Sequence, residues 1–245
     1  MRAANFRDAA CRLRDSMTLA KARQALRRCA NPKKARTFRG FFKNTSDIFL
    51  GVTTPQIRKL AREFQDLPLR DVHELMKSKI HEERSLAHAI LVLKFRRTDE
   101  SGKGAIFHFY MRNRKYIHEW DGVDDSAPYI VGPYLLDRDK KPIYELARSK
   151  SLWDRRIAMV STWWFIRQGQ VRDALKIARM LLRDEEDLIH KASGWMLREI
   201  GKRNLQALEK FLKEHHRGMP RTMLRYAIER FPHEKRRAYL TGKIH

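Results

Sequence analysis

Apolar residues recur at helical spacing along most of this 245-residue chain, and no other feature constrains its fold as strongly. Trp153, Ile157, Val160 and Trp164 fall at i, i+4, i+7 and i+11, which places them on one face of a helix. Alternating polar and apolar runs of the strand type are scarce, and prolines and glycines stand mostly between the helical segments. The pattern predicts an all-α protein.

The same pattern predicts helices joined by short turns. Thr53, Thr54 and Pro55 form a helix start with proline in the first turn. Expected helices cover residues 55–65, 68–78, 81–97, 99–115, 126–136, 139–149, 151–168, 170–183, 186–202, 204–216, 219–230 and 232–240. Helix pairs that recur every ~30–45 residues are typical of stacked helical hairpins, although we find no repeated sequence signature. We therefore predict a single domain over residues 1–245, built as one curved stack, an α-solenoid.

The charge of the chain points to a polyanionic partner. Lysine and arginine together number 53 against 29 acidic residues, which gives a formal net charge of +24. Such an excess is typical of proteins that bind a phosphate backbone. A generally basic protein, or one that touches acidic lipid or ribosomal RNA, remains an alternative. The concave face of a helical stack is an extended groove, and a groove rich in arginine and lysine would fit one face of a duplex.

Several classes of site find no support in the sequence. Cys11 and Cys29 cannot form a disulfide framework or a zinc site, and the ten histidines show no metal-ligand spacing. There is no glycine-rich phosphate loop and no nucleophile elbow. No apolar run approaches the ~18 residues that span a bilayer, and Met1 to Ser16 lacks the apolar core of a secretory signal. We expect a cytoplasmic protein without a metal, a cofactor or a membrane contact.

The sequence WDGVD, residues 120–124, is a candidate site. If the segment is helical, Trp120 and Asp124 project together from one face, whereas a turn at Gly122 would leave the geometry open. Asp121, Asp124 and Asp125 could instead cap the helix that follows. A phosphate-binding surface generally excludes acids, so carboxylates in so basic a chain equally suggest a chemical task.

Two further segments carry candidate residues. In the helix expected over 186–202, Trp195 lies beside the apolar face, on the flank that it shares with Lys191. It is either a functional aromatic or a tryptophan that covers the edge of the core. Arg155 and Arg156 follow Trp153 at the start of another helix, where each is either a phosphate clamp or an exposed solubilising charge.

Taken together, these segments resemble the AlkD-type DNA alkylation-repair family. The resemblance covers about residues 25–230, and four motifs occur in the right order. The motifs are TPQIRKL at 54–60, WDGVDDSAP at 120–128, WDRRIAMV at 153–160 and KASGWMLRE at 191–199, with residues 31–35 and 49–52 similar to the N-terminal signature.

The resemblance implies a HEAT-like stack of helical hairpins that acts as a monofunctional DNA glycosylase. Such enzymes release cationic N3- and N7-alkylpurines from double-stranded DNA and leave an abasic site, without flipping the lesion into a pocket. A monomer is expected. The resemblance further implies the roles of individual residues: a catalytic cluster of Trp120, Asp124 and Trp195, and DNA contacts by Arg156, Phe41, Thr53 and Lys191. A non-catalytic HEAT-like protein that binds distorted or branched DNA is the alternative.

Overall fold

A computed structural model describes residues 18–42 and 45–244, and within them the protein is all-α as predicted. Cys11 and the segment Met1 to Ser16 lie outside these residues. Apart from one parallel bridge between Ile48 and Ile80, the described part of the chain contains no β-structure. None of its helices is long and apolar enough to cross a membrane. The chain divides into two compact units, of which the first ends at Ile117 and the second begins at His118. The single-domain organisation therefore stays a prediction.

The first unit is organised around one long helix, α6. Its helices are α2 (Leu19–Arg28), α3 (Pro32–Arg39), α4 (Thr54–Glu63), α5 (Leu69–Met76), α6 (His81–Arg97) and α7 (Glu100–Asn113), followed by the 3-10 turn η1 (Arg114–Tyr116). Helices α2, α4, α5 and α7 all pack on α6. The core includes Leu86, Ile90 and Leu91 of α6, which are fully buried. Because α6 is covered on several sides, its apolar residues do not keep to a single stripe.

A buried carboxylate positions the start of α4. Glu82, in the first turn of α6, accepts hydrogen bonds from the backbone N–H groups of Leu50 at 2.9 Å, Gly51 at 2.7 Å and Val52 at 3.3 Å. Gly51 has a φ of 79°, and a Cβ there would lie 2.2 Å from the carbonyl oxygen of Asn31, so only glycine fits. These contacts fix the direction in which the chain enters α4.

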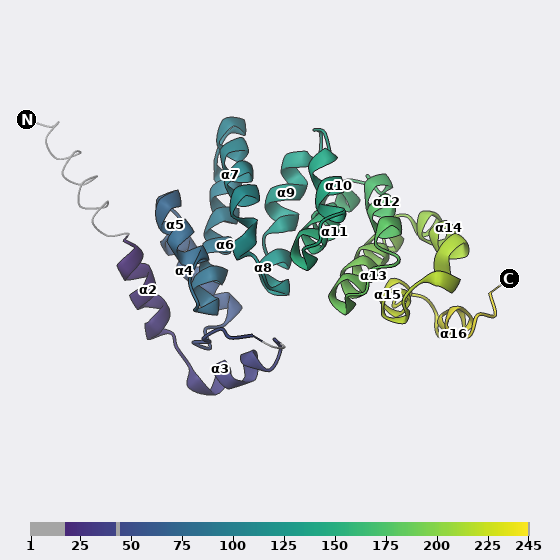
Figure 1. Cartoon of the computed structure of the whole chain (residues 1–245), viewed down its shortest axis with the longest axis horizontal. Coiled ribbons are helices and arrows are strands. Elements are labelled where there is room, and N and C mark those ends of the chain that lie inside the picture. The colour runs from purple at the N-terminus through teal and green to yellow at the C-terminus, as the bar shows by residue number, and fades with distance from the viewer. Residues whose placement is uncertain (1–17, 43–44, 245) are drawn as a thin grey trace, which may run out of the picture. The chain divides into compact units, whose positions relative to one another are not determined.

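The second unit contains the remaining helices, which follow one another in Figure 1. They are α8 (Trp120–Asp124), α9 (Ala127–Leu135), α10 (Lys141–Ala147), α11 (Leu152–Arg167), α12 (Arg172–Met180), α13 (Asp187–Gly201), α14 (Leu205–His215), the 3-10 turn η2 (His216–Gly218), α15 (Arg221–Ala227) and α16 (His233–Thr241). Helix α11 contacts α8, α9, α10, α12 and α13, which explains why most of its residues are buried. Every helix expected beyond residue 55 is present, with ends that differ by a few residues.

Helices α9, α11, α13 and α15 form a closely packed row within this unit. A Cβ on Gly132 of α9 would lie 2.5 Å from the carbonyl oxygen of Ser161 in α11. A Cβ on Gly194 of α13 would lie 2.5 Å from both the carbonyl oxygen of Met223 and the Cβ of Tyr226 in α15. At two of the three contacts in the row, α9–α11 and α13–α15, the helices therefore approach so closely that a glycine is needed.

Candidate functional site in the second unit

The WDGVD segment is helical, which settles the question that the sequence left open. It forms the single turn α8, whose first residue is Trp120 and whose last is Asp124, so the two share a face. Gly122 and Val123 between them are buried, and the Ser126 hydroxyl donates to the Gly122 carbonyl at 2.5 Å. The residue that caps α9 is Ser126. Asp124 therefore does not cap the next helix.

Asp124 is held instead by Arg156 of α11. The Nε of Arg156 donates to Oδ1 of Asp124 at 3.0 Å, and Nη2 donates to Oδ2 at 2.7 Å. A third N–H, on Nη1, donates to the carbonyl oxygen of Leu188 at 2.5 Å. The arginine side chain is 5% exposed and that of the aspartate 18%. This paired, planar contact fixes the direction of the carboxylate while one edge of it still meets solvent.

Burial and pairing act in opposite directions on the pKa of Asp124. Burial is the larger effect and raises the pKa above its ordinary value, whereas the Arg156 guanidinium lowers it by its charge and hydrogen bonds. Arg156 thus offsets part of the effect that burial has on the carboxylate. Each of its oxygens accepts one hydrogen bond from Arg156 and keeps a second lone pair for another donor.

Arg155, the neighbour of Arg156, makes a similar pair with a different acid. Its Nε and Nη2 donate to the two carboxylate oxygens of Asp184 at 2.6 and 3.1 Å, and its Nη1 donates to the carbonyl oxygens of Ser149 and Lys150. The two arginines are therefore neither exposed charges nor free phosphate clamps. Arg156 has two N–H groups left, so its contact with DNA stays a prediction.

Trp195 and Lys191 lie on α13, which packs against α11 and follows it in the row. Trp195 is half-buried, two helical turns after Leu188, whose carbonyl receives the Arg156 bond. Lys191 pairs with Asp187 one turn away at 2.7 Å, and both side chains are exposed. Trp195 therefore borders the apolar core without being enclosed by it, which is compatible with either role considered for it.

The two remaining predicted DNA contacts, Phe41 and Thr53, belong to the first unit. Phe41 follows α3 and is 64% exposed, an unusual position for a large aromatic side chain. Thr53 is the residue before α4, and both its backbone N–H and its hydroxyl donate to Oε1 of Gln56, at 3.0 and 2.7 Å. Its structural role is to start α4, as the sequence predicted.

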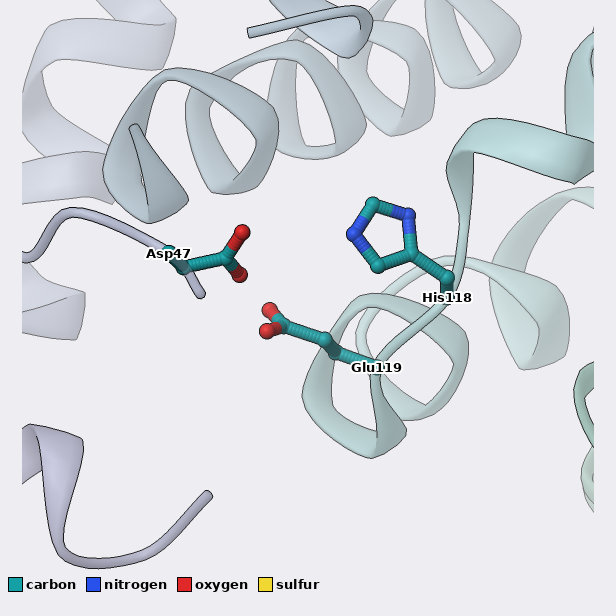
Figure 2. A group of neighbouring side chains, drawn as sticks. All are labelled: Asp47, His118 and Glu119. Atoms are coloured by element: carbon teal, nitrogen blue, oxygen red, sulfur yellow. The ribbon is translucent and has the colours of Figure 1, made fainter. Parts of the chain in front are cut away.

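Three side chains of metal-ligating type are drawn in Figure 2. His118 and Glu119 project from the segment that leads into α8, and Asp47 from the segment that leads into α4. Asp47 forms an ion pair with Arg84 of its own unit, with a second contact to Nη1 at 3.2 Å. Because Asp47 belongs to the first unit and the other two to the second, we assign no metal site to them.

The structure also reveals a local repeat that the sequence analysis missed. Arg84, the fourth residue of α6, donates from Nη1 to the carbonyl oxygen of Ser78, six residues earlier. Arg155, the fourth residue of α11, does the same to Ser149. The segments SKIHEERSLA and SKSLWDRRIA share only Ser-Lys at the start, then an acid and arginine, and alanine at the end. So sparse a signature is visible only when the contacts align it.

Both the sequence and the fold are similar to those of known proteins. A sequence profile described as DNA alkylation repair enzyme matches residues 22–231. No curated protein sequence matches the chain. A solved structure described as a predicted DNA alkylation repair enzyme from Enterococcus faecalis is similar in fold, with a TM-score of 0.65 and 18% identity over 83% of this chain and 97% of that one. On the match of the family profile to most of its length, the chain belongs to the DNA alkylation repair enzyme family.

Proposed function

We propose that the protein is a monofunctional DNA glycosylase that excises cationic N3- and N7-alkylpurines from duplex DNA as a monomer. The observation that carries the proposal is the Asp124 carboxylate, held in one direction by Arg156 and partly open to solvent. Membership of a DNA alkylation repair family and the net charge of +24 support duplex DNA as the partner. A HEAT-like arrangement of helical hairpins would supply the groove.

The proposed chemistry uses a carboxylate and needs no proton donor to the leaving base. An alkylated purine already carries a positive charge, so it can leave with the electrons of the C1′–N bond without being protonated. The sugar then becomes an oxocarbenium-like cation, which water attacks at C1′ to give the hydroxyl of the abasic site, with release of one proton to the solvent. A fixed carboxylate stabilises that cation and accepts a hydrogen bond from the water through a lone pair that Arg156 leaves free.

Arg156 has two roles in this proposal. It lowers the pKa of Asp124 against the larger effect of burial, and it fixes the carboxylate before the substrate arrives, so that little reorganisation is needed. The resemblance also implies a contact of Arg156 with a DNA phosphate, for which two of its N–H groups remain. Trp120, on the same face of α8 as Asp124, and Trp195 on α13 would offer aromatic faces to the sugar and the cationic base, at about 0.5–2 kcal/mol each.

The proposed reaction is tested by incubating the protein with duplex DNA that carries N7-methylguanine at one position. Free N7-methylguanine and an alkali-labile abasic site are expected, without strand cleavage before alkali. Tight duplex binding with no release of base would instead favour the alternative, a non-catalytic protein that recognises distorted DNA.

A further inference from the structure

Helices α11, α13 and α15 run side by side with their N-terminal ends together. Arg156 of α11 bonds the carbonyl of Leu188, the second residue of α13. Thr222, the second residue of α15, lies near Asp187, the first residue of α13, and helps to lower the pKa of that carboxyl. Adjacent packed helices are about 8–10 Å apart. Equivalent positions on the three helices therefore form a row along one edge of the second unit.

The fifth residue of each of these three helices is a cation: Arg156, Lys191 and Arg225. The helices that alternate with them in the sequence have no such regularity, since the fifth residues of α10, α12 and α14 are Glu145, Lys176 and Glu209. A row of cations about 8–10 Å apart is too widely spaced to enclose one small anion. It fits a partner that carries regularly spaced negative charges.

The three cations differ in whether a carboxylate of the same chain already pairs with them. Arg156 is committed to Asp124. Lys191 pairs with Asp187 on the surface, where the side chains are 41% and 58% exposed, so this pair is weak and readily exchanged. Arg225 is exposed, and among the described residues no carboxylate lies within ion-pair distance of it.

The local geometry turns Arg225 away from the core. Met223 and Ala227 of α15 are buried, and at ~100° per residue Arg225 lies opposite them. Thr222 and Tyr226, on the side next to it, face α13. An arginine in this position has five N–H donors, and no carboxylate of the described residues lies within ion-pair distance of it.

We propose that Arg225 binds the phosphate backbone of duplex DNA and extends the contact from Arg156 and Lys191 onto α15. The inference rests on the proposed function, because it takes duplex DNA as the ligand. It adds a binding residue in a helix to which the sequence assigned none. Arg225 acts on affinity for any duplex, since it touches backbone and not the lesion.

The test compares two variants that each remove one positive charge, Arg225→Gln and Lys176→Gln. Lys176 is the matched control: it is also exposed and the fifth residue of its helix, but α12 is not one of the row of helices α9, α11, α13 and α15. Affinity for an undamaged duplex is measured over a range of salt concentrations. Each phosphate contact contributes about 0.9 to the slope of log affinity against log salt.

We expect Arg225→Gln to weaken binding and reduce that slope by about 0.9, and Arg225→Lys to restore it. Lys176→Gln should leave the slope of the wild type. Equal slopes for Arg225→Gln and the wild type, with a steep slope in both, would overturn the inference while leaving DNA binding intact. A wild-type affinity that does not depend on salt would instead contradict the proposed function itself. Because Arg225 is exposed and unpaired, thermal unfolding should be the same in all variants.

Discussion

Replacing Arg156 with glutamine separates the structural and the chemical consequences of its pair with Asp124. The substitution removes two hydrogen bonds to a carboxylate whose side chain is only 18% exposed, and a third to the Leu188 carbonyl. Removing one partner of a buried pair costs about 3–5 kcal/mol. Because Asp124 keeps some contact with water, we expect about 3 kcal/mol, at the lower end of that range. For a protein of this size the unfolding midpoint should fall by ~6–12 °C.

Arg155→Gln is the matched control for this loss. Arg155 is the adjacent residue of α11 and also pairs through two hydrogen bonds with one aspartate, with side chains 16% and 5% exposed. We expect a similar loss of stability, measured by far-UV circular dichroism. Only Arg156→Gln, however, leaves Asp124 without its cation.

The pH dependence of excision distinguishes the two variants. Burial raises the pKa of Asp124 and Arg156 lowers it, so removing Arg156 leaves the raising effect unopposed and the pKa rises further. In the proposed mechanism excision requires the charged carboxylate, so activity should be lost as the pH falls through that pKa, and the acid limb of the Arg156→Gln pH profile should lie at higher pH. The measurement is single-turnover excision of N7-methylguanine from acid to neutral pH. An acid limb that shifts equally in Arg155→Gln, or in neither variant, would refute the reasoning.

Two further predictions concern α13. Gly194→Ala places a Cβ 2.5 Å from the Met223 carbonyl and from the Tyr226 Cβ, so we expect a loss of about 1–3 kcal/mol in unfolding free energy, against almost none for the control Gly218→Ala, whose Cβ meets nothing within 4 Å. Equal stability of the two variants would contradict the close approach of α13 and α15. Trp195→Ala should slow single-turnover excision by about tenfold, equivalent to ~1–2 kcal/mol of cation–π stabilisation, and unchanged excision would make Trp195 a cover for the core edge.

Local sequence patterns predicted the helices, but they did not predict the contacts between the helices. Pro55 after Thr53 predicted the start of α4, and the apolar spacing from Trp153 to Trp164 predicted α11, because proline geometry and side-chain periodicity are properties of the segment itself. The one-turn helix α8 was left open, since a five-residue segment with a central glycine has no periodicity to read.

At the candidate site, too, relations within one segment were predictable and contacts between distant segments were not. The i, i+4 spacing correctly suggested that Trp120 and Asp124 share a face once the segment is helical. The partner of Asp124 could not be read from the sequence, because Arg156 lies 32 residues away and is one of 53 basic residues. Which of two adjacent arginines meets which acid depends on how α11 is rotated against α8 and on where the chain before α13 passes.

The role of Asp124 is the central claim, and Asp124→Asn tests it most directly. The substitution keeps the size of the side chain and removes its charge. In single-turnover assays on duplex DNA with N7-methylguanine, at a temperature where the variant is fully folded, we expect excision to fall by about 10- to 1000-fold. Binding to the same duplex should be unchanged or tighter, because a negative charge has left a surface that meets phosphates. Excision at the wild-type rate would contradict the account and make the Asp124–Arg156 pair a purely structural contact.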